Sequence, residues 1–333
     1  MEEPSTSSHK GDRRADSRSS RATNSGFVTT LAGISLSVRA AEAASIDAFR
    51  ATFDPVDLGS QGTELDAPTV EVVLERDAPE TPADLQPVET YPDLLVRRDG
   101  DRLFMAHQSG LSATVDDDTV LVGGDADLVA AYRRVLPHAL AHVLATHDRF
   151  VMHAAGVVPP GSGAFVLIGS TGAGKSTLAS GALRAGWAVL GDDLVIVSRR
   201  GDDIVADAFP KPLAIPADAL DDADLSRLDP TDPRGRVSLP ASELARGEHL
   251  VAGVVLLERG RGPEVDDVST SDMVAAMVGS FPAASEPGRT RRFLTVAAQL
   301  ARGPTGTLRP SPDVRTSPAA AVASLTRLAE TLQ

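Results

Sequence analysis

The sequence of 333 residues contains no cysteine and very little lysine. The absence of cysteine excludes disulfide bonds, thiolate zinc sites and a cysteine nucleophile, and it fits a cytoplasmic protein. Lysine occurs only at Lys10, Lys175 and Lys211, so arginine supplies the rest of the positive charge. Because lysine is so rare, we interpret Lys175 and Lys211 as candidates for specific roles.

Long apolar runs and net positive charge are also missing. No stretch reaches the roughly 18 apolar residues that a membrane helix needs, and the polar start of the chain lacks the apolar stretch of a signal peptide. The formal net charge of −14 disfavours binding to nucleic acid or anionic lipid, because both require a basic surface. We therefore expect a cytoplasmic protein without a nucleic-acid or membrane partner. The oligomeric state stays open, with a homo-oligomer among the alternatives.

A glycine-rich loop is the most informative stretch that is present. Residues 165–168 form a short apolar run typical of a buried strand, and residues 175–185 have the spacing of a helix that ends before Gly186. The loop between them matches the pattern G-x-x-x-x-G-K-[ST]. Its candidate nucleotide-binding residues are Gly169, Ser170, Thr171, Gly172, Ala173, Gly174, Lys175, Ser176 and Thr177.

Each residue type in this loop has a physical reason to be there. Glycines allow the backbone N–H groups to surround a phosphate, and the following helix adds partial positive charge at its N-terminus. Lys175 would reach the β- and γ-phosphates, and Ser176 would ligate Mg²⁺. The alternative is a glycine-rich turn that matches the pattern by accident. With a strand before it and a helix after it, the loop predicts nucleotide binding.

Asp192 and Asp193 are the candidates for holding the metal and for acting on an acceptor. They lie between two apolar segments, 187–190 and 194–197, which predict strands, so we expect a buried or half-buried turn. Adjacent carboxylates in such a place are costly without a cation, and Mg²⁺ is the obvious one. An ordinary Gly-Asp-Asp turn is the alternative. Asp192 follows Lys175 by only 17 residues, a spacing that selects a narrow group of nucleotide-binding proteins.

Three segments in order resemble one family. They are His-Ala-Ala-Gly-Val at 153–157, the loop at 169–176 and Gly-Asp-Asp-Leu at 191–194. This order is similar to the kinase domain of HPr kinase/phosphorylase, which shares a P-loop fold with phosphoenolpyruvate carboxykinase. The resemblance covers residues 150–197 closely and the rest in outline. It implies an α/β fold with a P-loop kinase domain of this type, preceded by a small β-rich domain.

The resemblance also implies roles for individual residues. It implies ATP on residues 169–177, and Mg²⁺ on Ser176 and one of Asp192 and Asp193. The other aspartate would act as general base on a serine hydroxyl of a protein or peptide. His153 would lie near the transferred phosphate, or would be an ordinary core histidine at the end of a strand. With Lys175, these residues make up the expected catalytic set.

The chain departs from HPr kinases in one segment. The Leu-Glu-x-Arg-Gly stretch that contributes an active-site glutamate and arginine is missing, and Phe-Pro-Lys-Pro stands at 209–212. The resemblance therefore does not extend to HPr as the substrate or to the reverse phosphorylase reaction. Lys211 becomes a candidate contact to phosphate or substrate, with a solvated loop lysine as the alternative. Arg291 and Arg292 are further candidates for a phosphate contact.

The predicted organisation has four parts. Residues 1–26 form a disordered tail, 27–125 a small β-rich domain, 126–149 a connecting helix and 150–333 the ATP-binding domain. Pro137 predicts a kink or break in the connecting helix. We interpret His138, His142 and His147 as surface or helix-end residues in preference to metal ligands. An aspartate-rich loop at 218–232 is interpreted as solvated in preference to a calcium site.

The function predicted from sequence is that of a Mg·ATP-dependent kinase that transfers the γ-phosphate to a hydroxyl, a serine of a protein or peptide being the expected acceptor. Two alternatives stay open. One is phosphoryl transfer to a small carboxylic metabolite, as in phosphoenolpyruvate carboxykinase. The other is a regulator that binds ATP without catalysis.

Overall fold

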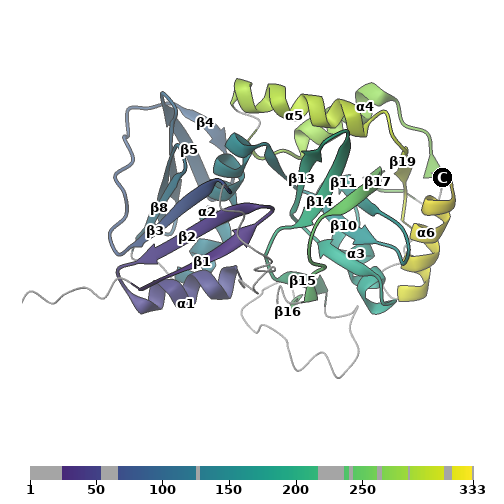
Figure 1. The fold of residues 1–333 in the computed structure, drawn as a ribbon, viewed down its shortest axis with the longest axis horizontal. Helices are drawn as coiled ribbons and strands as arrows, with labels where there is room; N and C mark the ends of the chain where they lie inside the picture. Colours follow the sequence, from purple (N-terminus) through teal and green to yellow (C-terminus); the bar gives the residue numbers. More distant parts are fainter. Residues whose placement is uncertain are drawn as a thin grey trace, which may run out of the picture.

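The computed structural model of the chain describes residues 25–53, 67–124, 128–216, 236–239, 243–260, 265–283, 286–310 and 317–331. It is a mixed α/β fold with two large sheets and six described helices (Figure 1). Most of the tail expected at 1–26 and the whole loop at 218–232 lie outside the described residues.

The first sheet contains eight strands in the order β1-β2-β3-β8-β7-β6-β5-β4. The strands are β1 (Ser25–Leu31), β2 (Ile34–Ala40), β3 (Thr69–Glu75), β4 (Pro87–Thr90), β5 (Leu94–Asp99), β6 (Arg102–His107), β7 (Ser112–Asp116) and β8 (Thr119–Gly123). Pairing is parallel for β2–β3 and β3–β8 and antiparallel elsewhere. The helices α1 (Ala43–Thr52) and α2 (Leu128–Leu144) pack on each other and on this sheet (Figure 1).

The sequence pattern explains most of this sheet. Buried and exposed residues alternate along β2 and β3, as expected for strands with one covered face. Two tight hairpins lie in this sheet: Asp99 pairs with Arg102, and Asp116 pairs with Thr119. Strand β4 forms although its Pro- and Glu-containing sequence is typical of an exposed loop.

Helix α2 differs from its prediction in two respects. It runs through Pro137 as one helix, so of the two predicted outcomes the break into two helices is wrong, and the kink stays a prediction. The alternative that His142 lies at the surface is wrong, because its side chain is 0% exposed, whereas the helix-end alternative is confirmed, because His142 lies in the last turn of α2. Residues from other elements enclose the side chain: Nε2 lies 3.7 Å from Glu89 Oε1 of β4, and Nδ1 lies 3.1 Å from Arg289 Nη1 of α5. Burial lowers the pKa of both His138 and His142.

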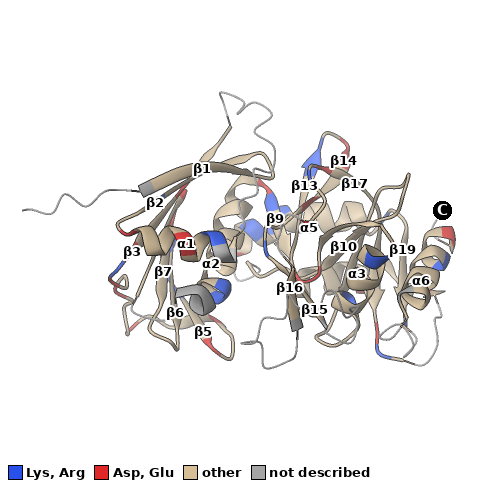
Figure 2. Cartoon of the chain, turned by 90° about the horizontal axis from the view of Figure 1, so that it is seen from below, with Lys and Arg blue, Asp and Glu red and all other residues tan. Residues whose placement is uncertain are grey.

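The second sheet contains nine strands, with the path β12-β10-β11-β17-β14-β13-β9 and β18–β19 added beside β17. The strands are β9 (Arg149–Met152), β10 (Ala155–Val158), β11 (Ala164–Gly169), β12 (Ala188–Gly191), β13 (Val195–Arg200), β14 (Asp203–Ala208), β17 (His249–Leu257), β18 (Val265–Asp266) and β19 (Thr305–Leu308). The helices are α3 (Lys175–Arg184), α4 (Thr270–Gly279), α5 (Pro287–Leu300) and α6 (Pro318–Thr331), and a short 3₁₀ turn, Ala145–His147, follows α2. β17 lies in the middle of this sheet, and the ribbons of β10 and β17 carry no Lys, Arg, Asp or Glu (Figure 2).

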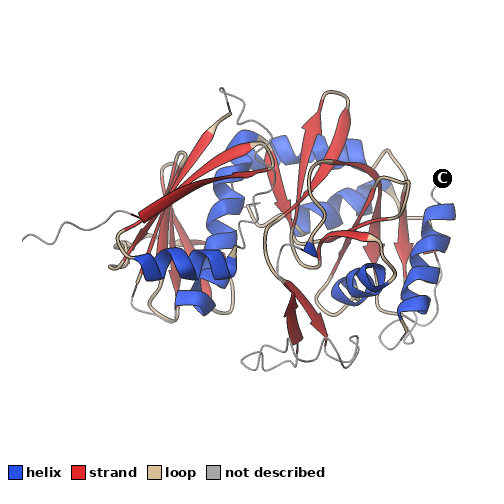
Figure 3. Cartoon of the chain, turned by 60° about the horizontal axis from the view of Figure 1, so that its bottom comes forward, coloured by secondary structure: helices blue, strands red, loops and turns tan. Residues whose placement is uncertain are grey.

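Two further strands lie apart from this sheet. β15 (Leu213–Pro216) and β16 (Arg236–Leu239) form a separate antiparallel ribbon, which projects from the body of the molecule (Figure 3). Among the described helices, none has the length and apolar character that a bilayer span requires.

The two sheets share a packed boundary. Along β13, Val195 and Val197 belong to the core of the second sheet, whereas Ile196 belongs to the core of the first. Val151 of β9 and Phe209, just after β14, also belong to the first core. The first sheet with its helices therefore packs directly on one face of the β9–β13–β14 region, and no flexible linker separates the two there.

Candidate functional site

The candidate residues meet where two long strands bend. The chain passes from β9 to β10 through His153 and Ala154, and from β12 to β13 through Asp192, Asp193 and Leu194. Because β9 pairs with β13 and β10 pairs with β12, the two bends lie side by side. Both β11 and β12 are antiparallel to β10, so they run in the same direction and end at the same edge of the sheet. This topology brings the aspartates to the loop that follows β11.

The glycine-rich loop has the predicted strand–loop–helix context. β11 ends at Gly169, and α3 begins at Lys175 after Gly174. Gly169 has φ +152°, and a Cβ there would lie 2.6 Å from the carbonyl oxygen of Leu257 on the neighbouring strand. A side chain at this position would therefore clash with backbone, which explains the glycine. The strand, the helix and the glycine at 186 (φ +78°) confirm the local structure expected from the sequence.

Lys175 is buried and directed at the backbone of its own loop. Its side chain is 6% exposed, and Nζ donates to the carbonyl oxygens of Gly169 at 2.6 Å and Ser170 at 3.4 Å. Burial lowers the pKa of Lys175, and the negative charges of Asp193 and Asp192 oppose that effect. A buried ammonium held only by neutral carbonyls is suited to pair with an anion that enters the loop.

Asp192 faces the loop and is incompletely satisfied. It is 4% exposed; Oδ1 accepts a long bond of 3.4 Å from the Ala214 amide, and Oδ2 has no hydrogen-bond partner among the described residues. The Ser176 hydroxyl lies beside it and donates to the backbone oxygen of Asp192 at 3.5 Å. Burial raises the pKa of Asp192, and the charge of Asp193 raises it further.

Asp193 has the opposite environment. Its carboxylate pairs with His153 Nε2 at 3.0 Å and with the Lys211 ammonium, and its side chain is 36% exposed. Burial alone would raise the pKa of Asp193, but Lys211 and the hydrogen bond from His153 outweigh that effect and hold the pKa well below its usual value. The backbone N–H of His153 donates to Ser280 at 2.7 Å, which fixes the bend that presents the imidazole. His153 and Lys211 thus lie with Asp193, as an active-site role would require.

The donor set of this site fits Mg²⁺. An unpaired buried carboxylate oxygen on Asp192 and the hydroxyl of Ser176 are hard oxygen donors, the type that Mg²⁺ prefers. Within the described residues no group of three or more His, Asp or Glu side chains is placed to hold a metal.

Other predicted residues lie elsewhere. Arg292 pairs with Asp148 at 2.9 Å and donates to the carbonyl of Ala145 at 2.8 Å, so it joins α5 to the end of α2. Arg291 is exposed on the same helix. His147 pairs with Asp118 at 2.7 Å. The structure does not bring these residues to the loop.

Sequence reasoning missed one arginine at the loop. Arg259 follows β17, which is parallel to β11, and its Nη2 donates to the carbonyl of Thr171 at 2.7 Å. A Cβ at Gly172 would lie 2.7 Å from that nitrogen, so the second glycine of the loop leaves room for the guanidinium. The signal available in the sequence was the position of Arg259 just beyond the most apolar strand, which predicts the same sheet edge.

Comparison with known proteins gives no further guide, since no protein-family model and no curated protein matches the chain. The case for a function therefore depends on the site itself.

Proposed function

We propose that this protein is a Mg·ATP-dependent kinase of the HPr-kinase-like P-loop type, which transfers the γ-phosphate to a hydroxyl, with a serine of a protein or peptide as the acceptor. The observation that carries the proposal is the pair of adjacent aspartates in contrasting environments beside the glycine-rich loop. Asp192 has a free buried oxygen next to Ser176, and Asp193 is paired with His153 and Lys211.

This contrast favours different roles for the two aspartates, which the sequence alone does not distinguish. Asp192 and Ser176 would hold Mg²⁺, which would supply positive charge to neutralise the phosphates. Asp193, held ionised by the Lys211 ammonium and the hydrogen bond from His153, would accept the proton of the acceptor hydroxyl. In the transfer, the hydroxyl oxygen forms a bond to the γ-phosphorus, the bond from that phosphorus to the β–γ bridging oxygen breaks, and ADP leaves.

The remaining residues would bind and orient the reactants. The loop amides and Lys175 would hold the triphosphate, since the ammonium already lies inside the loop. His153 and Lys211 border the acceptor side of Asp193; Lys211 would bring positive charge and His153 a hydrogen-bonding imidazole near the transferred phosphoryl group. A phosphate near Lys211 would also compete with Asp193 for the ammonium, which would raise the basicity of that carboxylate.

The test is phosphoryl transfer from γ-labelled ATP to proteins and peptides of the source organism's own lysate. Wild type should label an acceptor in a magnesium-dependent way. Asp193→Asn should lower transfer by about 10²- to 10⁴-fold, the usual loss for a general base, while Mg·ATP affinity by calorimetry changes by less than about threefold.

The matched control is Asp203→Asn, which removes the same charge at the exposed start of β14 and should leave transfer unchanged. Absence of heat on mixing wild type with Mg·ATP would overturn the proposal. Binding of ATP without any transfer by wild type would favour the non-catalytic regulator instead.

A further inference from the structure

Phe209 joins the candidate site to the first sheet. It immediately follows β14, yet its side chain is 1% exposed and belongs to the core of the first sheet. Its ring meets Phe53 edge-on with centroids 5.2 Å apart, and Phe53 stacks on Phe49 of α1 at 5.4 Å. A residue from the nucleotide-loop half of the chain is thus anchored in the aromatic core of the other half.

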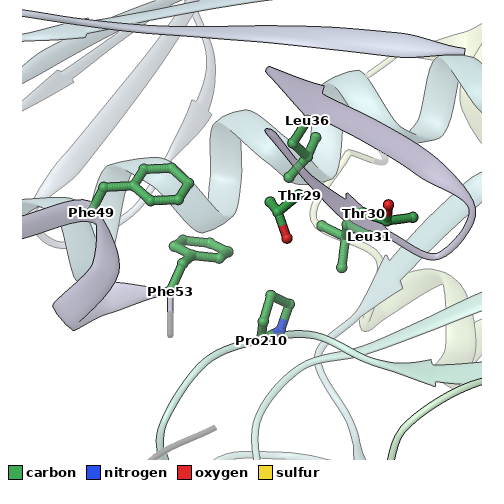
Figure 4. Close-up of a pocket in the computed structure, with 7 residues that line it drawn as sticks. All are labelled: Thr29, Thr30, Leu31, Leu36, Phe49, Phe53 and Pro210. Atoms are coloured by element: carbon green, nitrogen blue, oxygen red, sulfur yellow. The ribbon is translucent and has the colours of Figure 1, made fainter. Parts of the chain in front are cut away.

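The segment after Phe209 is short and stiff. The Lys211 amide donates to the carbonyl of Phe209 at 2.6 Å, which closes a tight turn around Pro210. Pro210 and Pro212 restrict φ on both sides of Lys211. Pro210 is itself buried and lines a small apolar pocket together with Phe53 (Figure 4). The position of Lys211 therefore follows closely from the position of Phe209.

The anchor is fixed relative to the bend that carries Asp193. Ile196, three residues after Asp193, lies in the same core as Phe209, and so does Val151, two residues before His153. The two bends and the Phe209 anchor are therefore packed against one common core. A change in that core at Phe209 would move the Lys211 ammonium with respect to Asp193.

We propose that Phe209 is a positioning residue, through which the N-terminal sheet and its helices set the place of the Lys211 ammonium beside Asp193. The first sheet would then be a structural part of the acceptor side of the site and not an independent module. The catalytic consequence rests on the proposed kinase function, whereas the placement of Lys211 does not.

Lysine labelling tests the placement without ATP or an acceptor. Because the chain has only three lysines, mass spectrometry after acetylation at pH 8 reports on Lys10, Lys175 and Lys211 separately. In Phe209→Ala, Lys211 should be acetylated at least about fivefold faster than in wild type, the effect of losing a partly buried ion pair. Lys175 should keep its rate, because it is held by its own loop. Asp193→Asn gives the rate of Lys211 without its partner.

Matched variants separate positioning from general loss of stability. Met105→Ala truncates another fully buried side chain of the same core and should leave the Lys211 rate unchanged. Phe209→Leu keeps apolar volume and should restore most of the protection. If Phe209→Ala does not fold, Pro210→Gly loosens the turn while leaving the Phe209 ring in place, and it should also speed the labelling of Lys211.

Phosphoryl transfer provides the second measurement. Phe209→Ala should lower kcat about tenfold or more with the KM for ATP within about threefold, since the nucleotide loop is untouched. Unchanged Lys211 labelling in folded Phe209→Ala and Pro210→Gly variants would overturn the inference. If wild type transfers no phosphate, the proposed function fails, and the labelling result still decides the role of Phe209.

Discussion

The two halves of the candidate site are built in different ways. The half proposed to bind phosphate, called the phosphate half, comes from one continuous stretch, residues 169–177, whose conformation is fixed by glycines, a buried strand and a helix start. The half proposed to face the acceptor, called the acceptor half, brings together His153, Asp193 and Lys211 from three separate segments through side-chain pairs. Local backbone geometry makes the first half, whereas long-range packing makes the second.

This difference has a consequence for robustness. The loop depends on its own strand and helix and on Arg259 after β17, all of which belong to the second half of the chain, so its geometry should tolerate changes in the first sheet. The acceptor half depends on the bends between strands and on Phe209, which is anchored in the other core. It should therefore respond to changes in the N-terminal sheet that leave nucleotide binding intact.

The two site lysines offer the largest contrast between the halves. Lys175→Met should weaken Mg·ATP binding by about 10- to 100-fold, because a charge-assisted contact to phosphate contributes about 1.5–3 kcal/mol. Lys211→Met should change ATP affinity by less than about threefold but should strongly reduce phosphoryl transfer. Calorimetry and labelled-ATP transfer measure the two effects separately. Equal loss of ATP affinity in both variants would show that Lys211 contributes to nucleotide binding as much as Lys175 does, which contradicts the proposed separation of the two halves.

The two aspartates should differ in the sign of their effect on stability. In the ligand-free protein at pH 7, Asp192→Asn should raise the free energy of unfolding by about 1–3 kcal/mol, since it removes a buried and unsatisfied charge. Asp193→Asn should lower it by about 1 kcal/mol, the contribution of a partly exposed ion pair. Urea titrations measure both values.

The pH dependence of these effects follows from the direction of each pKa shift. Folding raises the pKa of Asp192, so its penalty is present above that raised pKa and disappears as the pH falls. Folding lowers the pKa of Asp193, so its contribution is present above the unfolded value near pH 4 and is lost as the pH falls below it. The stabilisation in Asp192→Asn should therefore shrink on acidification. If both variants change the free energy of unfolding in the same direction at pH 7, the contrast between the two aspartates is wrong.

The sequence predicted the phosphate half better than the acceptor half for a physical reason. Glycine positions, a short apolar run and a helix start are local signals, so the loop from Gly169 to α3 was predicted correctly. The pairing of Lys211 with Asp193 depends on where β14 ends relative to the bend at β12–β13, and no local pattern encodes that register. Phe209 begins a proline-rich segment, which is typical of extended structure, and no local pattern indicates that its side chain is buried in the core of the first sheet.

The same reasoning explains the errors in the connecting helix. A proline usually disrupts a helix because it lacks an N–H donor, yet α2 continues through Pro137 while packed against α1, the first sheet and β9. The helical spacing of His142 does not reveal that residues of other elements enclose its side chain. Tertiary packing decided both outcomes, and it lies outside what periodicity can predict.

Arg259 provides the smallest test, because it joins the phosphate half through a single exposed hydrogen bond to a neutral carbonyl. Its guanidinium donates to the carbonyl of Thr171 and occupies the space beside Gly172. Arg259→Ala should weaken Mg·ATP binding about 3- to 10-fold, since one such bond contributes about 0.5–1.5 kcal/mol and the loop would lose a support from β17. Fluorescence titration with a nucleotide analogue measures the change.

Arg302→Ala is the matched control, because it removes an equal charge from an exposed arginine just after α5. If both variants weaken Mg·ATP binding equally, the effect comes from the change in net charge alone. Arg259→Lys adds a finer comparison. If the guanidinium acts only by supporting the loop backbone, lysine should not replace it, because lysine lacks the planar fork of N–H donors that reaches the carbonyl of Thr171. If lysine restores full affinity, the side chain acts as a point charge toward the phosphates, and the phosphate half is then less self-contained than its continuous sequence implies.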